Sequence, residues 1–250
     1  MQHDSKKTIL LRADDLGYSK GVNYGIKRCV DKKTIRTVGL IVNLNDSQHG
    51  FDLIKDADLC LGLHVNITYG KPLADPKQVP SLLQPSGVFR SSKAYPCMID
   101  YEEVYKEVEK QYERFLEITQ RMPDYMEGHA ILDETFLKAI EEVAKKHQIL
   151  YVPSIPNPDQ PAFLHGKPTY FWLESMQKDY DPAQTFKRVS NIQREGCEVI
   201  IFHPGFVDDD LMNRSSLLLP RVKEVCFLTA EDLIETITSE PNRFITYREL

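Results

Sequence analysis

The sequence predicts an α/β fold in which about seven parallel strands form a closed or nearly closed barrel with helical crossovers. Short apolar runs alternate with amphipathic helical segments about seven times along the chain, which is typical of a parallel sheet. The chain has 250 residues, a length that suits one such barrel. No shift in composition marks a domain boundary, so we expect residues 1–250 to form a single domain.

The expected strands are apolar runs of the kind that become buried strands in parallel sheets. Residues 198–202 form the clearest run, and residues 169–173 form a weaker one. The other expected strands cover residues 9–11, 37–42, 59–64, 125–126 and 149–152, with a terminal strand at 244–247.

The expected helices carry apolar side chains at helical spacing on one face. Ser19 is a predicted N-cap, and Asp100 with Glu103 forms a predicted capping box. The helices cover residues 19–33 and 47–55 and begin, further along the chain, at Asp100, Asp133, Asp181 and Thr229. Residues 68–98 are too many for an ordinary connection, so we expect a functional loop or an insert there, and a Pro-rich loop at 153–168.

Composition limits the partners and the compartment. The net charge is −6, which argues against nucleic acid and membrane surfaces as partners because both require a basic face. No apolar run approaches the ~20 residues of a transmembrane helix, and no apolar signal segment precedes the first strand. The five cysteines are scattered and include no C-x-x-C pair, which favours free thiols in a reducing cytoplasm.

Ionisable residues follow four of the predicted strands. Asp14 and Asp15 follow the first apolar run, and His64, His129 and His203 follow three later runs. Taken singly, an aspartate here can be a helix cap or a solvated charge, and a histidine can be a satisfied structural residue. Parallel strands of a barrel point their C-terminal ends at one face, where active sites lie. The coincidence at four strand ends therefore indicates one shared site.

This set of residues predicts a catalytic cation site. One carboxylate and two neutral imidazoles leave coordination positions open, as in catalytic rather than structural metal sites. A bound ion lowers the pKa of a water molecule and polarises a carbonyl group. A second carboxylate can then take a proton from that water, and a separate histidine can protonate the leaving group. The residues fit the hydrolysis of an amide or an ester.

Segments spread in order along nearly the whole chain carry a resemblance to a known family. They are Asp14-Asp15-Leu16-Gly17-Tyr18-Ser19 with Gly21-Val22-Asn23-Tyr24-Gly25-Ile26, and residues 37–43, 62–68 with 70–73, 203–208 and 247–249. With these segments the chain resembles the YdjC/ChbG-like carbohydrate deacetylases, which include the chitooligosaccharide deacetylases.

The resemblance implies a distorted TIM-like barrel, in a homodimer, that removes N-acetyl groups from amino sugars or small oligosaccharides such as chitobiose or its phosphates. It also implies a divalent metal ion, Mg²⁺ or Zn²⁺. By position, Asp15, His64 and His129 are the implied metal ligands, Asp14 the general base, and His203 the general acid or oxyanion partner. Adjacent residues of a strand point to different sides, so the two aspartates are not expected to bind the same ion.

One segment departs from the family pattern. The family has Asp-Ser-His followed by further histidines at the fourth strand, whereas this chain has Glu127-Gly128-His129-Ala130-Ile131-Leu132. His129 keeps the ligand position, but apolar residues replace the histidines that follow it. The identity of the sugar therefore stays open. Glu127 either orients a metal ligand from behind or is simply exposed.

Four more residues are expected to bind substrate. Asn43 and Asn66 lie at strand ends and can hydrogen-bond a sugar, and Tyr69 can stack on a pyranose ring. Arg12 lies inside the first strand. If its side chain faces the barrel interior, it can pair with one of the two aspartates and keep it ionised; if the side chain faces outwards, it is a solvated charge.

Two other functions remain open from the sequence. The same barrel and ion can support phosphoester hydrolysis or sugar isomerisation, although phosphoester chemistry often uses two metals and more carboxylates than we find. A sugar-binding protein without catalytic activity is the other alternative. Counting bound ions tests the former, and acetate release from diacetylchitobiose tests the latter.

Overall fold

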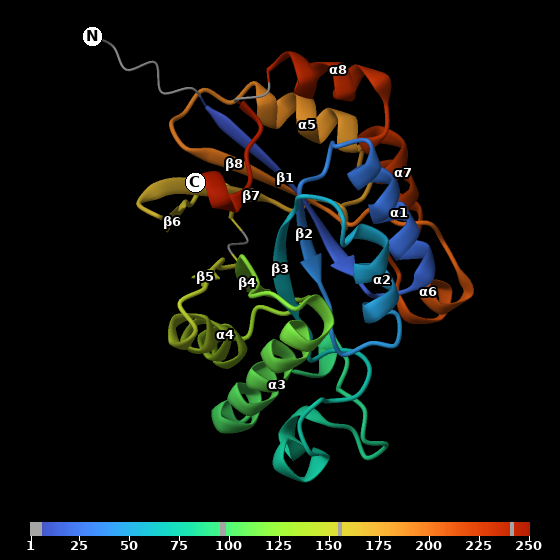
Figure 1. Ribbon diagram of the computed structural model, residues 1–250, viewed down its shortest axis with the longest axis vertical. Coiled ribbons are helices and arrows are strands. Elements are labelled where there is room, and N and C mark those ends of the chain that lie inside the picture. Colours follow the sequence, from blue (N-terminus) through green and yellow to red (C-terminus); the bar gives the residue numbers. More distant parts are fainter. Residues whose placement is uncertain (1–6, 96–98, 155–156, 241–242) are drawn as a thin grey trace.

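The computed structural model describes residues 7–95, 99–154, 157–240 and 243–250; one of the five cysteines, Cys97, for which a free thiol is expected, falls outside these ranges. Within them the strands form one sheet in the order β5-β4-β3-β2-β1-β8-β7-β6 (Figure 1). The strands are β1 (Thr8–Leu16), β2 (Thr37–Leu40), β3 (Cys60–Val65), β4 (Tyr125–Gly128), β5 (Leu150–Tyr151), β6 (Ala162–Leu164), β7 (Lys167–Trp172) and β8 (Cys197–Phe202).

Every neighbouring pair in this sheet is parallel except β6 and β7, which are antiparallel. The sheet curves into a nearly closed barrel whose two edge strands are β5 and β6. The predicted barrel of about seven parallel strands is therefore confirmed. Strand β6 is an addition, because the sequence predicted only a loop at residues 153–168.

Helices surround the sheet on its outer face, with α1, α2 and α7 on one side and α3 and α4 on another (Figure 1). The helices are α1 (Lys20–Asp31), α2 (Ser47–Ile54), α3 (Tyr101–Thr119), α4 (Glu134–Lys146), α5 (Pro182–Ser190), α6 (Asp209–Arg214), α7 (Leu219–Leu228) and α8 (Glu231–Ser239). Short 3-10 helices cover Pro76–Gln78, Pro80–Leu82, Ser92–Ala94 and Tyr247–Glu249. In the described part of the chain, no helix has both the length and the hydropathy needed to span a membrane.

Several local predictions can now be compared with the structure. Ser19 caps α1 by accepting a hydrogen bond from the Val22 N–H. Asp100 caps α3, but the capping box is incomplete because Glu103 instead accepts from the Ser81 N–H. The terminal strand is wrong: residues 244–247 form only an isolated bridge to β1, and a 3-10 helix follows.

Helices α6 and α7 were not predicted from the sequence. On the buried side of α7, Val225 and Leu228 lie together with two ionisable residues, Arg221 and Glu224. A buried helix face that carries charges does not show the apolar periodicity from which helices are predicted. The omission matters, because α7 contributes directly to the site.

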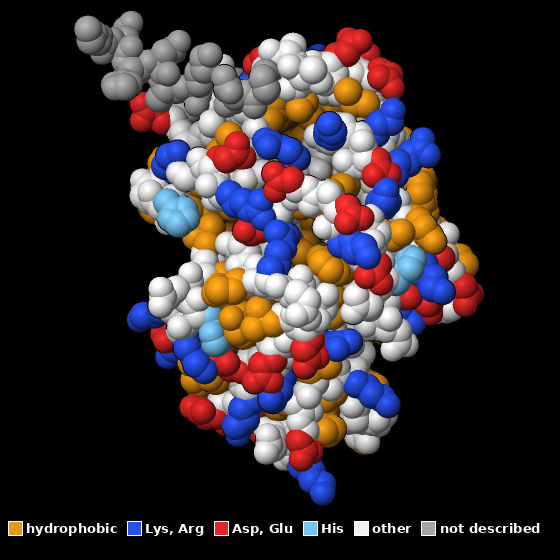
Figure 2. Space-filling model, viewed as in Figure 1, with side chains coloured by type: hydrophobic (Ala, Val, Ile, Leu, Met, Phe, Trp, Pro, Cys, Tyr) orange, Lys and Arg blue, Asp and Glu red, His pale blue; other side chains and the backbone are white. Residues whose placement is uncertain are grey.

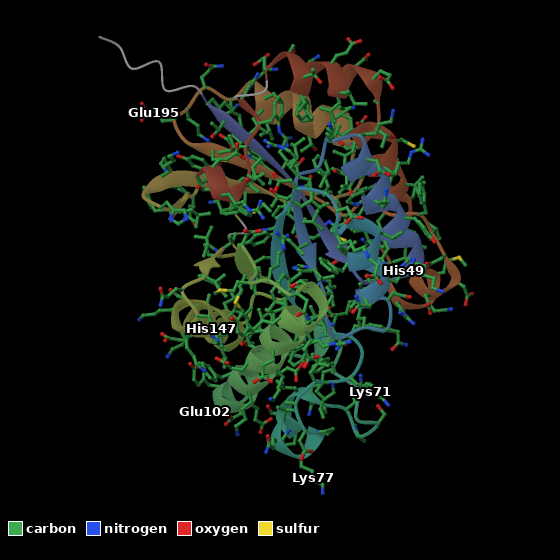
Figure 3. All side chains as sticks on the ribbon, viewed as in Figure 1. His49, Lys71, Lys77, Glu102, His147 and Glu195 are labelled. Carbon is green, nitrogen blue, oxygen red and sulfur yellow. The ribbon has the colours of Figure 1, made fainter. Side chains whose placement is uncertain are left out.

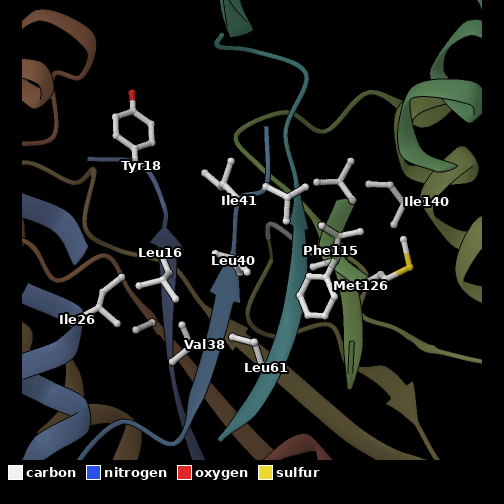
Figure 4. Packing of buried hydrophobic residues seen from close by; sticks show 14 of the residues in the cluster. Leu16, Tyr18, Ile26, Val38, Leu40, Ile41, Leu61, Phe115, Met126 and Ile140 are labelled. Carbon is white, nitrogen blue, oxygen red and sulfur yellow. The ribbon is translucent and has the colours of Figure 1, made fainter. Parts of the chain in front are cut away.

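The core has two layers, one on each face of the sheet. On the outer face, Leu16, Val38 and Leu61 of the strands pack with Phe115 of α3 and Ile26 of α1 (Figure 4). Inside the barrel a smaller apolar cluster includes Leu10, Tyr125, Phe171, Val199 and Ile201. Side chains alternate between these faces along each strand. On the molecular surface, acidic and basic side chains are interspersed over the face seen in Figure 2.

Candidate active site

The two adjacent aspartates lie at an irregular point of β1. The pairing register with β2 shifts between Ala13 and Leu16, and Asp15 has a φ of 75°. Non-glycine residues rarely adopt this left-handed conformation, which carries a conformational cost. The two aspartates belong to two different groups of residues whose potential ligand atoms lie close enough to hold a metal ion. Asp15 groups with His64 and His129, and Asp14 groups with His64 and Glu127.

Three potential ligand atoms converge in the first group. Asp15 Oδ1 lies 3.3 Å from His64 Nε2 and 3.1 Å from His129 Nδ1, and the two nitrogens are 3.0 Å apart. Atoms that bind one cation at about 2.0–2.1 Å lie roughly 2.9–3.4 Å from one another. The spacing therefore fits a single ion held by these three atoms.

The environment of the His64 ring also fits a cation bound by Asp15, His64 and His129. Its Nδ1 contacts Glu127 Oε1 and is assigned as the nitrogen that keeps its proton, so Nε2 is the nitrogen that faces the other two ligand atoms and that gives up its proton when a cation binds. Asp15 Oδ1 is buried and accepts no hydrogen bond. Burial opposes a charge on His64, but the carboxylates of Glu127 and Asp14 raise its pKa to about 10. This surplus of negative charge is suited to a cation.

Each aspartate is held by its own buried arginine. Arg12 donates to Asp14 Oδ2 at 2.7 Å, and Arg221 donates to Asp15 Oδ2 at 2.6 Å. In both carboxylates Oδ1 has no hydrogen-bond partner among the residues that the structure describes. Burial raises the pKa of Asp14 despite Arg12. Burial acts the same way on Asp15, but Arg221 and His129 hold its pKa well below the usual range. Asp15 is thus a fixed anion, whereas Asp14 is the better proton acceptor.

The structure decides between the alternatives for Arg12 and Glu127. Arg12 faces the barrel interior and pairs with Asp14; it also lies 3.5 Å from Glu127 Oε2 and 3.3 Å from the Tyr247 hydroxyl. Glu127 is 2% exposed and lies behind His64. Gly39 of β2 leaves room for this cluster, since a Cβ there would lie 3.1 Å from Asp14 Oδ1. The guanidinium offsets part of the negative charge of the Asp14–Glu127 pair.

His203 reaches the same cavity from the end of β8. Its Nδ1 lies 3.3 Å from Ser175 Oγ, its backbone N–H donates to Glu224, and Arg221 donates to its carbonyl oxygen. Ser175, Arg221 and Glu224 were not singled out from the sequence. Arg221 and Glu224 are three residues apart, which places them on one helical face, but nothing in the sequence joins that face to β1 and β8.

A cavity of about 660 Å³ brings the predicted residues together. Its walls include Arg12, Asp14, Asp15, His64, Tyr69, His129 and His203. Tyr69 stacks on Tyr18 with ring centroids 5.9 Å apart. Asn43 and Asn66 are not part of the cavity wall. Their side chains hydrogen-bond each other and the carbonyl oxygen of Tyr69, so they fix the loop that carries Tyr69.

His49 and His147, which Figure 3 labels, lie away from this site. His49 belongs to α2, and His147 follows α4 and contacts Glu109. Lys71 is exposed on the long segment between β3 and α3 (Figure 3). The strand-end histidines are therefore distinguished from the rest by their position at the barrel rim.

Solved structures share this fold. A protein of Enterococcus faecalis V583 that is named for cellobiose-phosphate cleavage matches 98% of this chain and 99% of its own, with a TM-score of 0.84 at 22% identity. A family 4 acetyl xylan esterase from Clostridium thermocellum, solved with a cobalt ion, matches 97% of this chain and 89% of its own, with a TM-score of 0.53 at 11% identity. The fold is thus that of a class of distorted β/α barrels.

The family model described as YdjC-like protein matches residues 8–239, and the chain therefore belongs to the YdjC-like family. Curated relatives include a protein of Geobacillus stearothermophilus named carbohydrate deacetylase, which is 29% identical with 96% of each chain covered. A protein of Serratia marcescens named chitooligosaccharide deacetylase is 27% identical, with 91% of this chain and 93% of the relative covered.

Proposed function

We propose that this protein is a carbohydrate deacetylase that uses a divalent cation to remove an N-acetyl group from an amino sugar or a small oligosaccharide. The observation that carries the proposal is the convergence of Asp15, His64 and His129 on one point, with Asp14 and His203 in the same cavity. The names of the curated relatives support carbohydrate deacetylation, and one of them names chitooligosaccharides. The substrate that we propose is chitobiose-like, phosphorylated or not.

The residues have complementary roles in this proposal. Asp15, His64 and His129 hold the ion, Mg²⁺ or Zn²⁺, and Arg221 and Glu127 orient two of these ligands from behind. When bound, a divalent cation supplies Lewis acidity toward the amide carbonyl and the attacking water.

Asp14 takes a proton from the water through its free Oδ1 as the new C–O bond forms. The C–N bond then breaks, and the leaving nitrogen gains a proton from His203. The products are acetate and a free amine.

Substrate is held by the remaining cavity wall. Tyr69, supported by Tyr18, offers a stacking face for a sugar ring. Asn43 and Asn66 support binding through the Tyr69 loop rather than by direct contact. Arg12 contributes through the orientation of Asp14. The homodimer, the single-domain organisation and the cytoplasmic location expected from the sequence remain parts of this proposal.

The phosphoesterase alternative is less well supported. Among the described residues, the second group that could hold a cation is Asp14, His64 and Glu127, but Arg12 already donates to Asp14 and lies beside Glu127. One ion per chain is therefore expected. That number suits amide hydrolysis better than two-metal phosphoester chemistry.

The test combines cation content with product release. Chelated protein is reloaded with Zn²⁺ or Mg²⁺, and acetate release from diacetylchitobiose is measured. We expect release only from the loaded protein. His64→Ala and His129→Ala should lose both bound ion and activity, whereas His147→Ala, a histidine remote from the site, should lose neither. Full ion content in both rim variants would contradict the assignment, and ion binding without acetate release would favour a sugar-binding protein.

A further inference from the structure

Behind His203, buried hydrogen-bonding groups lead away from the cavity. His203 Nδ1 lies 3.3 Å from Ser175 Oγ, and Ser175 Oγ lies 2.7 Å from Glu224 Oε1. Ser175 is 1% exposed and Glu224 is fully buried. Because Nδ1 is engaged by Ser175, Nε2 is the ring nitrogen left to meet a substrate in the cavity that His203 lines.

Glu224 is fixed by neutral donors from two other segments. The Tyr180 hydroxyl donates to Oε1 at 2.9 Å, and the His203 backbone N–H donates to Oε2 at 2.6 Å. The charged and titratable groups around the carboxyl are Arg221 on its own helix, Tyr180 and His203 after β7 and β8, and Cys29 on α1. Within the described part of the chain, no cationic side chain donates a hydrogen bond to the Glu224 carboxyl.

Neutral histidine carries a proton on only one ring nitrogen. Burial lowers the pKa of His203 to about 4 against the attraction of Asp15, so the ring is neutral near pH 7. A neutral ring can give up a proton from Nε2 only if Nδ1 gains one. Burial raises the pKa of Glu224 to about 7, which lets this carboxyl hold a proton near neutrality.

We propose that Glu224, Ser175 and His203 form a proton relay that supplies the leaving group in the deacetylation proposed above, on which this inference rests. The His203 Nε2–H bond breaks as the amide nitrogen gains that proton. When Glu224 is protonated, its carboxyl donates to Ser175 Oγ and the Ser175 hydroxyl turns to donate to His203 Nδ1. Ser175 then passes its hydroxyl proton to Nδ1, and Glu224 passes its proton to Ser175 Oγ.

The proton balance of the relay is closed. At its end Glu224 is a carboxylate, Ser175 is a hydroxyl again, and His203 is neutral with its proton on Nδ1. A proton from water in the cavity then adds to His203 Nε2, the Nδ1 proton returns to Ser175 Oγ, and the Ser175 hydroxyl proton returns to Glu224, which restores the starting state. Solvent also removes the proton held by Asp14. Ser175 and Glu224 act through His203 and are therefore positioning residues.

The experiment compares two leaving groups in the cation-loaded protein. The amine of an N-acetyl sugar needs a proton to depart, whereas the phenolate of phenyl acetate does not. Ser175→Ala should lower kcat for acetate release from diacetylchitobiose by about 10²-fold or more with KM little changed, because acid catalysis is lost. Chelator-sensitive hydrolysis of phenyl acetate should be retained, which also reports that the variant is folded.

Further variants separate the relay from simple packing. Ser175→Thr keeps the hydroxyl and should restore kcat, whereas Glu224→Gln should behave like Ser175→Ala. In the wild type, kcat should fall as the pH rises past about 7, where Glu224 loses its proton. Tyr180→Phe removes one donor to the carboxylate, which raises the pKa of Glu224 and moves this decline to higher pH.

An equal loss on both substrates, no loss in Ser175→Ala, or a pH profile unchanged by Tyr180→Phe would overturn the relay. These outcomes leave the proposed function intact as long as the wild type releases acetate. A wild type that releases none overturns the proposed function and the relay with it.

Discussion

In the half of the site formed by Asp15, His64 and His129, the carboxylate of Asp15 is paired with Arg221 at 2.6 Å. In the other half, formed by His203, Ser175 and Glu224, the described residues that hydrogen-bond the Glu224 carboxyl are all neutral: the Ser175 hydroxyl, the Tyr180 hydroxyl and the His203 backbone N–H. Both carboxyl groups are almost completely buried. We call these the cation half and the histidine half.

The two carboxyl groups nevertheless have opposite pKa shifts. Burial favours the neutral form of each, but Arg221 and His129 hold the pKa of Asp15 well below its usual range. Around Glu224 the neutral donors offset burial only in part, and its pKa rises to about 7. The charge of the partner, not the depth of burial, therefore decides whether a buried acid is a permanent anion or a proton carrier.

The largest expected effect separates Asp15, a member of the cation half, from its neighbour Asp14. Asp14→Asn should lower kcat by roughly 10²–10⁴-fold while the ion stays bound, because a proton acceptor is lost. Asp15→Asn should lose the ion itself, because an anionic ligand is removed. Elemental analysis together with acetate release distinguishes the two. Equal ion content in the two variants would contradict the assignment of roles.

Removing Arg221 should break the pairing that defines the cation half. Arg221→Met leaves Asp15 buried without its partner, so the free energy of unfolding of the cation-free protein should fall by about 3–5 kcal/mol. Urea denaturation measures this change. Lys27→Met, which removes an exposed ion pair with Asp31, is the control and should cost about 0–1 kcal/mol. A similar small cost for both variants would mean that Asp15 is not held as a buried anion.

Glu224→Gln tests the histidine half through the pH dependence of stability. The pKa of Glu224 is raised on folding, so its contribution to stability is complete below the unfolded value of about 4.5 and is lost as the pH rises through about 7. The wild type should therefore lose about 3 kcal/mol relative to the variant between these limits. Urea denaturation at pH 4.5 and pH 8 measures the difference. Parallel pH profiles for the two proteins would show that Glu224 is already ionised.

The smallest expected effect is stabilisation of the cation half by its ion. At a free ion concentration of about 100 times Kd, the free energy of unfolding should rise by about 2.7 kcal/mol, because the ion binds only the folded chain. Thermal or urea denaturation with and without Zn²⁺ or Mg²⁺ measures this shift. His129→Ala should abolish the stabilisation and His147→Ala should retain it; the reverse result would place the ion elsewhere.

The members of the cation half were predictable because each belongs to a strand end. A strand is recognised from a short apolar run, and the residue that follows it lies at the barrel rim in any parallel barrel. The same reasoning brought Asp14 and His203 to this rim. It did not reveal that the positive φ of Asp15 lets both aspartates approach His64.

The supporting residues could not be predicted in this way. Arg12 was left with two orientations, and Asn43 and Asn66 were expected to bind sugar although their amides hold the Tyr69 loop. The capping box at Asp100 and the terminal strand at residues 244–247 looked plausible locally, but contacts with distant segments changed both. Such contacts leave no periodic trace in the sequence.

The sequence by itself determined the alternation of strands and helices, the barrel, and the residues placed at its rim, because these follow from patterns within a few neighbouring residues. Only the tertiary structure decided which of those residues are charged. Asp15 and Arg221 are 206 positions apart, and Ser175 and Glu224 are 49 apart. The protonation of a buried group depends on the partners that folding brings to it, and those partners come from elements whose sequences show no sign of the contact.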